Sequence, residues 1–118
     1  MPDSAIYQST NDRYFTEAQA LLEPECRVLP SNAEEVSQIV KIAAENSCKF
    51  AVASGKHWAI PGGSNIGPEG FTIDLANLNT TSLSADGKVG SVGPGVRGGA
   101  VYDYFNQFNV YVGVGRGA

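Results

Sequence analysis

The sequence predicts an α+β fold, in which a β-α-β unit is followed by antiparallel strands and a second helix. Three observations lead to this prediction: helical periodicity after a capping asparagine, short apolar runs on both sides of that helix, and an Asp-Gly turn between two extended runs. The 118 residues allow one domain at most. An apolar content of 42% is enough for a packed core.

The β-α-β unit is expected between residues 26 and 53. Cys26–Leu29 is a short strand candidate, and Phe50–Ala53 is a second one. Between them, Asn32 can cap a helix, and Glu35 three residues later completes a capping box. The expected apolar face of this helix consists of Val36, Ile39, Val40 and Ala43, and Asn46 is a plausible end. A strand-helix-strand unit of this length predicts parallel strands, which we expect to be adjacent.

The flanking segments complete the expected fold. A short helix over Tyr14–Leu22 ends before Pro24, and a loop rich in glycine and proline covers Ile60–Gly70. The remaining expected elements are a strand at Phe71–Leu75, a hairpin from Leu83 to Val92 around Asp86-Gly87, a helix at Val101–Phe108 and a strand at Val110–Val114.

Composition argues against several classes of protein. The net charge is −4, and the eight basic residues are scattered, which argues against a nucleic-acid partner. No stretch approaches the roughly 20 apolar residues of a membrane span. The N-terminus, Met1–Ser4, lacks the basic and apolar regions of a signal peptide, so the sequence as written predicts no secretion and leaves the compartment open.

The two cysteines, Cys26 and Cys48, leave two interpretations open. Together with one histidine they make a poor zinc set, so no metal site is expected. They are either two small, buried free thiols or a disulfide, which is possible because both lie near strands that we expect to be neighbours.

The turn Ser54-Gly55-Lys56-His57 is the strongest candidate site. It follows an apolar strand, and His57 is the only histidine of the chain. Backbone N–H groups at a glycine turn can converge on a phosphate, to which Ser54 would add a hydroxyl and Lys56 a positive charge. An ordinary turn at the end of a strand is the alternative, since no Walker A pattern is present.

Other residues have similarly open roles. The dense glycines Gly93, Gly95, Gly98 and Gly99 indicate either close approach to a ligand or a tight strand-to-helix turn. Asp74, at the end of an expected strand, could pair with a base or cap a turn. Trp58 could pack on a cofactor or fill the core under the long loop.

Four segments taken in order carry a family resemblance. They are Pro24–Val36, the Phe50–His57 segment, Gly63–Ile66 with the strand at Ile73–Leu75, and Val92-Gly93-Pro94-Gly95-Val96 with Gly99 and Tyr102. Together they resemble the FAD-linked oxidoreductases of the vanillyl-alcohol oxidase and p-cresol methylhydroxylase superfamily, especially its berberine-bridge-enzyme-like branch.

The resemblance implies a cofactor, FAD, and roles for individual residues. His57 lies at the position whose ring nitrogen is bonded to the 8α-methyl of the flavin in that family. Ser54, Gly55 and Lys56 would face the diphosphate, and Trp58, Gly93 and Gly95 would lie near the flavin. Residues 24–118 would be the first part of a PCMH-type FAD-binding domain, and residues 1–23 an N-terminal extension.

The sequence also departs from the family pattern. Where the family has Arg-Ser-Gly-Gly-His, Ala53 replaces the arginine and Lys56 the second glycine. A side chain at position 56 could restrict a positive φ or obstruct the phosphates, or lysine could pair with them. The resemblance ends at Val112–Arg116, before the substrate domain and the expected catalytic base.

Two functions therefore remain open. The chain would be the FAD-binding part of an oxidoreductase that moves hydride from an alcohol, sugar, amine or secondary metabolite to FAD and then to oxygen. A small-molecule substrate is expected only if the missing region is supplied. The alternative is a non-catalytic remnant, or an accessory module that binds a partner chain.

Overall fold

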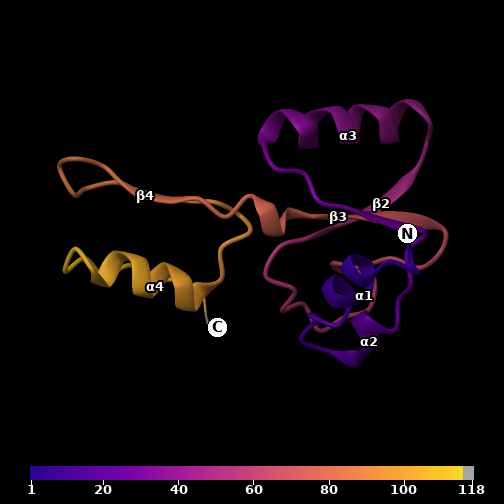
Figure 1. Ribbon diagram of the computed structural model, residues 1–118, viewed down its shortest axis with the longest axis horizontal. Helices are drawn as coiled ribbons and strands as arrows, with labels where there is room; N and C mark the ends of the chain where they lie inside the picture. The colour runs from indigo at the N-terminus through magenta and orange to yellow at the C-terminus, as the bar shows by residue number, and fades with distance from the viewer. Residues whose placement is uncertain (116–118) are drawn as a thin grey trace.

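A three-stranded parallel sheet forms the centre of the computed structural model, which describes residues 1–115. Its strands are β1 (Cys26–Val28), β2 (Lys49–Ala53) and β3 (Gly70–Asp74), in the order β1-β3-β2. Helix α3 (Ala33–Glu45) lies on one side of the sheet, and the short helices α1 (Ala5–Asn11) and α2 (Glu17–Ala20) lie on the other (Figure 1). This is the predicted β-α-β unit, with a third parallel strand inserted between its two strands.

A second group of elements projects from the end of β3. The 3-10 turn η1 (Leu75–Asn77) leads into an antiparallel hairpin of β4 (Thr81–Leu83) and β5 (Gly90–Val92), followed by α4 (Gly98–Asn106). Figure 1 shows that this hairpin and α4 lie beside each other and extend away from the parallel sheet. The buried Phe105 of α4 packs against Gly90, where a Cβ atom would lie 2.6 Å from its ring. The α+β class predicted from the sequence is confirmed.

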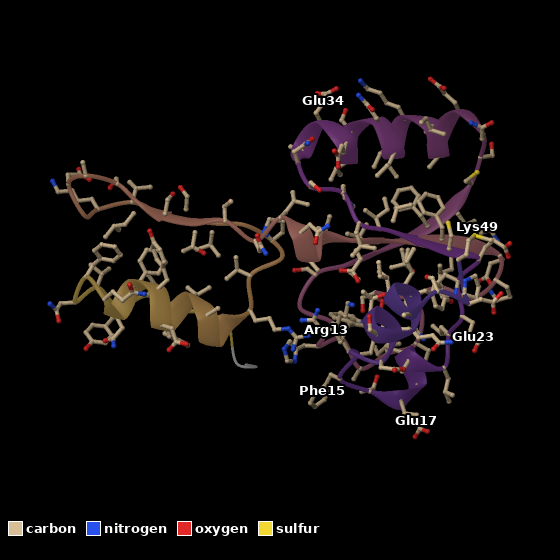
Figure 2. All side chains as sticks on the ribbon, in the orientation of Figure 1. Arg13, Phe15, Glu17, Glu23, Glu34 and Lys49 are labelled. Atoms are coloured by element: carbon tan, nitrogen blue, oxygen red, sulfur yellow. The ribbon has the colours of Figure 1, made fainter. Side chains whose placement is uncertain are left out.

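Helix α3 begins and ends where the sequence predicts. The Asn32 side chain accepts a hydrogen bond from the Glu35 N–H at 2.9 Å. The Glu35 carboxylate in turn accepts from the N–H of Ser31, at 2.6 Å, one residue earlier than in the standard capping box. Asn46 is the C-cap, and Ser47 then takes a positive φ of 53° that turns the chain toward β2. Glu34 points away from the sheet, as expected of the polar face (Figure 2).

Four expectations need correction. β3 lies between β1 and β2, so the two strands of the β-α-β unit are parallel but not adjacent. The helix expected over Tyr14–Leu22 is only the short α2, because the Tyr14 ring is buried in the core; α1 was not predicted. Helix α4 begins earlier than expected, at Gly98. Val110–Val114 is not a strand, because no other strand of residues 1–115 pairs with it.

The two faces of the parallel sheet differ in chemistry. Toward α3, an apolar cavity of about 260 Å³ is lined by residues of the sheet and the helix, namely Cys26, Val28, Ile39, Ile42, Ala43, Cys48 and Phe71. Toward α1 and α2, the alternating side chains are polar and buried: Arg27, Thr72 and Asp74. The best-buried part of the molecule is thus a polar layer. Within residues 1–115, no helix is long and apolar enough to cross a membrane.

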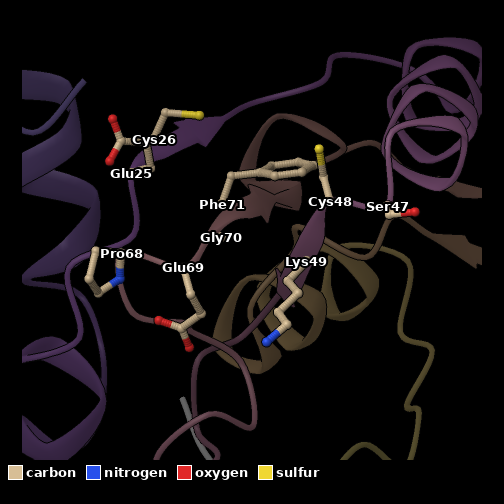
Figure 3. Close-up of a pocket in the computed structure, with 9 residues that line it drawn as sticks. All are labelled: Glu25, Cys26, Ser47, Cys48, Lys49, Pro68, Glu69, Gly70 and Phe71. Carbon is tan, nitrogen blue, oxygen red and sulfur yellow. The ribbon is translucent and has the colours of Figure 1, made fainter.

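Both cysteines are free thiols. Cys26 is the register partner of Phe71 on β3, and Cys48 immediately precedes β2 on the opposite side of β3. Figure 3 shows Cys26 and Cys48 on either side of Phe71 in a shallow pocket. Strands two positions apart in a sheet are separated by roughly 9–10 Å, which exceeds the reach of a disulfide. Of the two interpretations of the cysteines, the free thiols hold.

Thiol titration of the native protein should therefore give two reactive groups without a reductant. Cys48 is exposed and should react with a thiol reagent faster than the half-buried Cys26. Cys48→Ser should remove the fast phase and leave the slow one, and Cys26→Ser should do the reverse. Two thiols that appear only after reduction would contradict this arrangement of strands.

Candidate functional site

The buried layer beneath the sheet contains a cluster of three charged side chains. The Lys56 Nζ lies 2.7 Å from the Asp74 Oδ2, and the Arg27 Nη1 lies 3.7 Å from the same oxygen. All three side chains are at most 3% exposed. Asp74 comes from the end of β3, Arg27 from β1, and Lys56 from the turn after β2. One carboxylate thus links the carboxyl end of the sheet to that turn.

Hydrogen bonds connect this cluster to the N-terminal segment 1–23. Lys56 Nζ donates to the Thr10 carbonyl at 2.7 Å, and the Arg27 Nη2 donates to the Tyr14 hydroxyl at 2.7 Å. The Tyr14 hydroxyl donates to the Ser64 carbonyl at 2.6 Å. Asn65, which is fully buried, donates to Asn11, Gln19 and Leu22. Segment 1–23, predicted as an extension, forms one side of the structure around the turn.

Burial perturbs two groups of this cluster. Burial raises the pKa of Tyr14 to about 12, although the nearby Arg27 opposes the shift. Burial also lowers the pKa of the Lys56 ammonium, and its hydrogen bond and ion pair with Asp74 oppose that change. Both shifts arise because a charge in this layer has lost most of its contact with water.

The turn after β2 presents unused hydrogen-bond donors. Lys56 has a φ of 61°, in the left-handed region that glycine occupies most easily. The N–H groups of Gly55, Lys56, His57 and Trp58 donate to no protein acceptor within residues 1–115. Successive unpaired N–H groups beside a left-handed residue are a feature of backbone anion sites.

His57 is exposed at this turn. Its imidazole has no hydrogen-bond partner within the described chain, and its ring centroid lies 5.8 Å from that of Phe15. Phe15 itself is 71% exposed and lies in the layer of α1 and α2 (Figure 2). The imidazole is therefore accessible to a ligand and is flanked by an aromatic ring.

The Lys56 side chain is buried, whereas the imidazole of His57 is exposed. Of the three effects weighed for this residue, a pairing of its ammonium with phosphates finds no support, because the buried ammonium is bonded to Asp74 and Thr10. Its backbone takes the positive φ despite having a side chain. Ala53 is fully buried and is the register partner of Asp74, so its small side chain lies on the same face as the carboxylate.

The second glycine-rich loop contacts the turn after β2. The Ser54 hydroxyl donates to the Pro94 carbonyl. Gly93 and Gly95 use their N–H groups within the protein, donating to Thr80 at 2.8 Å and to Leu78 at 2.9 Å. A Cβ atom on either glycine would lie 2.2 Å from a backbone oxygen, that of Leu78 or of Leu75. Their lack of side chains is thus explained by packing in a tight turn.

The structure shows the contacts of Asp74 and Trp58, whose roles the sequence left open. Asp74 both pairs with cations and caps η1, accepting from the Ala76 N–H at 3.2 Å. The Trp58 ring covers Gly63, where a Cβ atom would lie 1.9 Å from it, yet Trp58 stays 58% exposed. Trp58 therefore packs on the loop rather than filling the core.

Sequence reasoning missed the polar layer. Tyr14, Gln19, Arg27 and Asn65 were not identified as parts of the site, although all are buried. A charged Arg27 inside a short apolar strand was the available signal. Over residues 1–115 no group of histidine, cysteine and carboxylate side chains is suited to hold a metal ion. Arg116, in the last segment of the resemblance, lies outside the described residues.

Gly95→Ala should destabilise the protein with or without a cofactor. The new methyl group would overlap the Leu75 and Ala76 carbonyls, at 2.2 Å and 2.8 Å, and the backbone would have to shift. Overpacking of this kind costs about 1–3 kcal/mol. The free energy of unfolding by urea measures the effect, and Gly113→Ala, with no atom within 4 Å, is the control. Equal stability of both variants would contradict the packing role.

Stability should fall as the pH rises from about 10 to about 12. The Tyr14 phenol has a pKa of 10.0 when unfolded and about 12 when folded, so in this interval the folded state keeps a proton that the unfolded state has lost. Tyr14 alone should lower the free energy of unfolding by about 1.4 kcal/mol for each pH unit. Tyr14→Phe should flatten this slope in urea unfolding. A slope unchanged by the substitution would contradict the assignment.

Comparison with known proteins agrees with this geometry. The profile of the FAD binding domain matches residues 24–118, and the chain therefore belongs to the FAD binding domain family. An FAD-dependent monooxygenase of Arthrobotrys oligospora is 44% identical over 93 residues, which are 79% of this chain and 18% of that protein. The FAD-dependent monooxygenase macF of Penicillium terrestre is 41% identical over 115 residues, or 98% of this chain and 22% of that protein.

The fold has a counterpart among solved structures. BBE-like protein number 28 of Arabidopsis thaliana superposes with a TM-score of 0.71 at 20% identity, over 89% of this chain and 22% of that chain. The fold of the chain is thus that of a BBE-like protein, and the predicted FAD-binding family is confirmed by the match over residues 24–118. FAD is the cofactor of this family. The chain spans about a fifth of the length of these relatives.

Proposed function

We propose that this chain is the FAD-holding part of a flavin-dependent oxidoreductase, with the turn Ser54–Trp58 as the cofactor site. The observation that carries the proposal is the set of unpaired backbone N–H groups beside an exposed imidazole, in a chain of the FAD binding domain family. Unpaired N–H groups fit an anionic diphosphate, because each can donate to a phosphate oxygen without losing a bond within the protein.

Individual residues have distinct parts in this proposal. The N–H groups of Gly55 and Lys56 would hold the diphosphate. The Ser54 hydroxyl would donate to a phosphate oxygen in place of its present bond to the Pro94 carbonyl. His57 would bind the flavin covalently through a ring nitrogen, since its imidazole is exposed and free of hydrogen bonds within the described residues. The half-exposed Trp58 would lie beside the isoalloxazine.

Gly93 and Gly95 belong to the second part of the proposed site. Ser54 joins their loop to the turn after β2 through its bond to Pro94, which supports a common site for both segments. Because the N–H groups of both glycines are already used, this loop would contact the flavin by van der Waals packing along its backbone.

For the whole protein, we propose the oxidation of a small organic molecule. FAD supplies the acceptor for a hydride from the substrate, and oxygen would reoxidise it. The relatives named as FAD-dependent monooxygenases support oxygen as the co-substrate. The chain's own residues bind and orient the cofactor, and a substrate pocket would require chain equivalent to the rest of these relatives. A non-catalytic module that binds nucleotide or a partner chain is the competing function.

His57→Ala should abolish covalent FAD without unfolding the protein, since the imidazole has no structural partner within the described residues. The measurement is the visible absorption of acid-precipitated protein after incubation with FAD. We expect flavin bands in the pellet for the natural chain and none for the variant. Lys88→Ala, which changes an exposed residue between β4 and β5, is the control and should keep the bands.

The remaining outcomes separate the alternatives. Flavin in the pellet of His57→Ala would contradict His57 as the attachment residue. Flavin of the natural chain released into the supernatant would mean binding without the covalent bond. A colourless natural chain would favour the non-catalytic module.

A further inference from the structure

We propose that Lys56 is a positioning residue for the flavin site: its buried ammonium fixes the turn that presents His57, and it makes segment 1–23 part of that site. The inference rests on the proposed function of His57 but concerns the Lys56 side chain, whereas the proposed function uses only the N–H group of that residue. It starts from the cluster of Lys56, Asp74 and Thr10.

The backbone conformation at position 56 requires stabilising contacts. A residue with a side chain at a φ of 61° is strained, and such residues persist where the surrounding structure fixes them. Lys56 is 4% exposed, whereas Ser47 and Asn109, the other non-glycine residues with positive φ among residues 1–115, are exposed. The contacts of the Lys56 side chain are therefore in a position to stabilise the turn.

Those contacts join three separate segments. The ammonium is 2.7 Å from Asp74 at the end of β3 and 2.7 Å from the Thr10 carbonyl at the end of α1. It also lies 5.2 Å from the centre of the Tyr14 ring, over its face. The backbone adds a fourth contact, because the Lys56 carbonyl accepts from the Phe15 N–H at 3.1 Å. Residue 56 is thus fixed to segment 1–23 by side chain and main chain together.

This arrangement determines where the imidazole lies. His57 follows Lys56 directly, has no hydrogen bond of its own within residues 1–115, and is adjacent to Phe15. With no polar partner, the ring direction depends on the backbone of the turn and on Phe15, whose N–H donates to the Lys56 carbonyl. Losing the ammonium would remove the side-chain bonds that join this turn to Asp74 and Thr10.

The charge balance indicates which variant to use. Lys56→Met alone leaves Asp74 buried with only Arg27, 3.7 Å away, and this could prevent folding. Lys56→Met/Asp74→Asn removes both partners and leaves one net positive charge in the cluster, that of Arg27, whose Nη2 still donates to Tyr14 and Asn65. Lys56→Arg keeps the cation as the conservative rescue, and Lys41→Met on the exposed face of α3 is the control.

The test is NMR of the 118-residue chain without added cofactor. His57 is the only histidine, so imidazole signals report on it alone. In Lys56→Met/Asp74→Asn we expect these signals to broaden or shift, with the amides of α3 unchanged. The Phe15 amide, which donates to the Lys56 carbonyl, should exchange at least about 10-fold faster. Lys56→Arg should restore most of the natural spectrum. Unchanged imidazole signals and exchange rates in the double variant would overturn the proposal.

A second readout connects the turn to the cofactor. The rate at which FAD becomes covalently bound is measured as the flavin retained in acid-precipitated protein. This rate should fall at least about 10-fold in the double variant and stay unchanged in Lys41→Met. If the NMR signals of the double variant change but its rate of covalent FAD binding does not, the positioning role is overturned. If the natural chain never retains FAD, the proposed attachment at His57 fails, while the NMR comparison still decides whether Lys56 orders the turn.

Discussion

The burial of one carboxylate, Asp74, is the constraint on which the rest of this structure depends. A buried carboxylate must be paired, and here the two cations come from opposite sides of β3, namely Arg27 of β1 and Lys56 of the turn after β2. Lys56 reaches this carboxylate from a turn in which its own backbone has a left-handed conformation. The same ammonium bonds to Thr10, which fixes the N-terminal helices beneath the sheet. Sheet, turn and N-terminal segment are thus ordered around a single charge.

The local elements were predictable because their signals are local. The Asn32 and Glu35 cap, the Asp86-Gly87 turn and the apolar run of β2 each specify structure within a few residues. The order β1-β3-β2 was not predictable, because periodicity reports neither which strand lies between two others nor how a later strand inserts. The strand expected at Val110–Val114 failed for a related reason: an apolar run becomes a strand only with a partner.

The candidate site divides in the same way. The turn Ser54–His57 could be located from residue types and a family pattern, whereas the direction of the Lys56 side chain depended on a carboxylate 18 positions further on. One signal was nevertheless present. Relative to the resembling motif, Ala53 loses a positive charge and Lys56 gains one, and both residues lie close to Asp74. Together the two changes leave the charge of the buried layer the same. Neither change alone would indicate this compensation.

The proposed site uses the backbone N–H groups of the turn after β2 to bind the cofactor. Mapping the amide chemical shifts on addition of FAD tests this most directly. Adding FAD to the ¹⁵N-labelled chain should shift the amides of Gly55 to Trp58 most strongly, because these N–H groups are unpaired within the described residues. The amides of Gly93 and Gly95, already bonded to Thr80 and Leu78, should shift less. Shifts confined to other parts of the chain, or none at saturating FAD, would contradict the account.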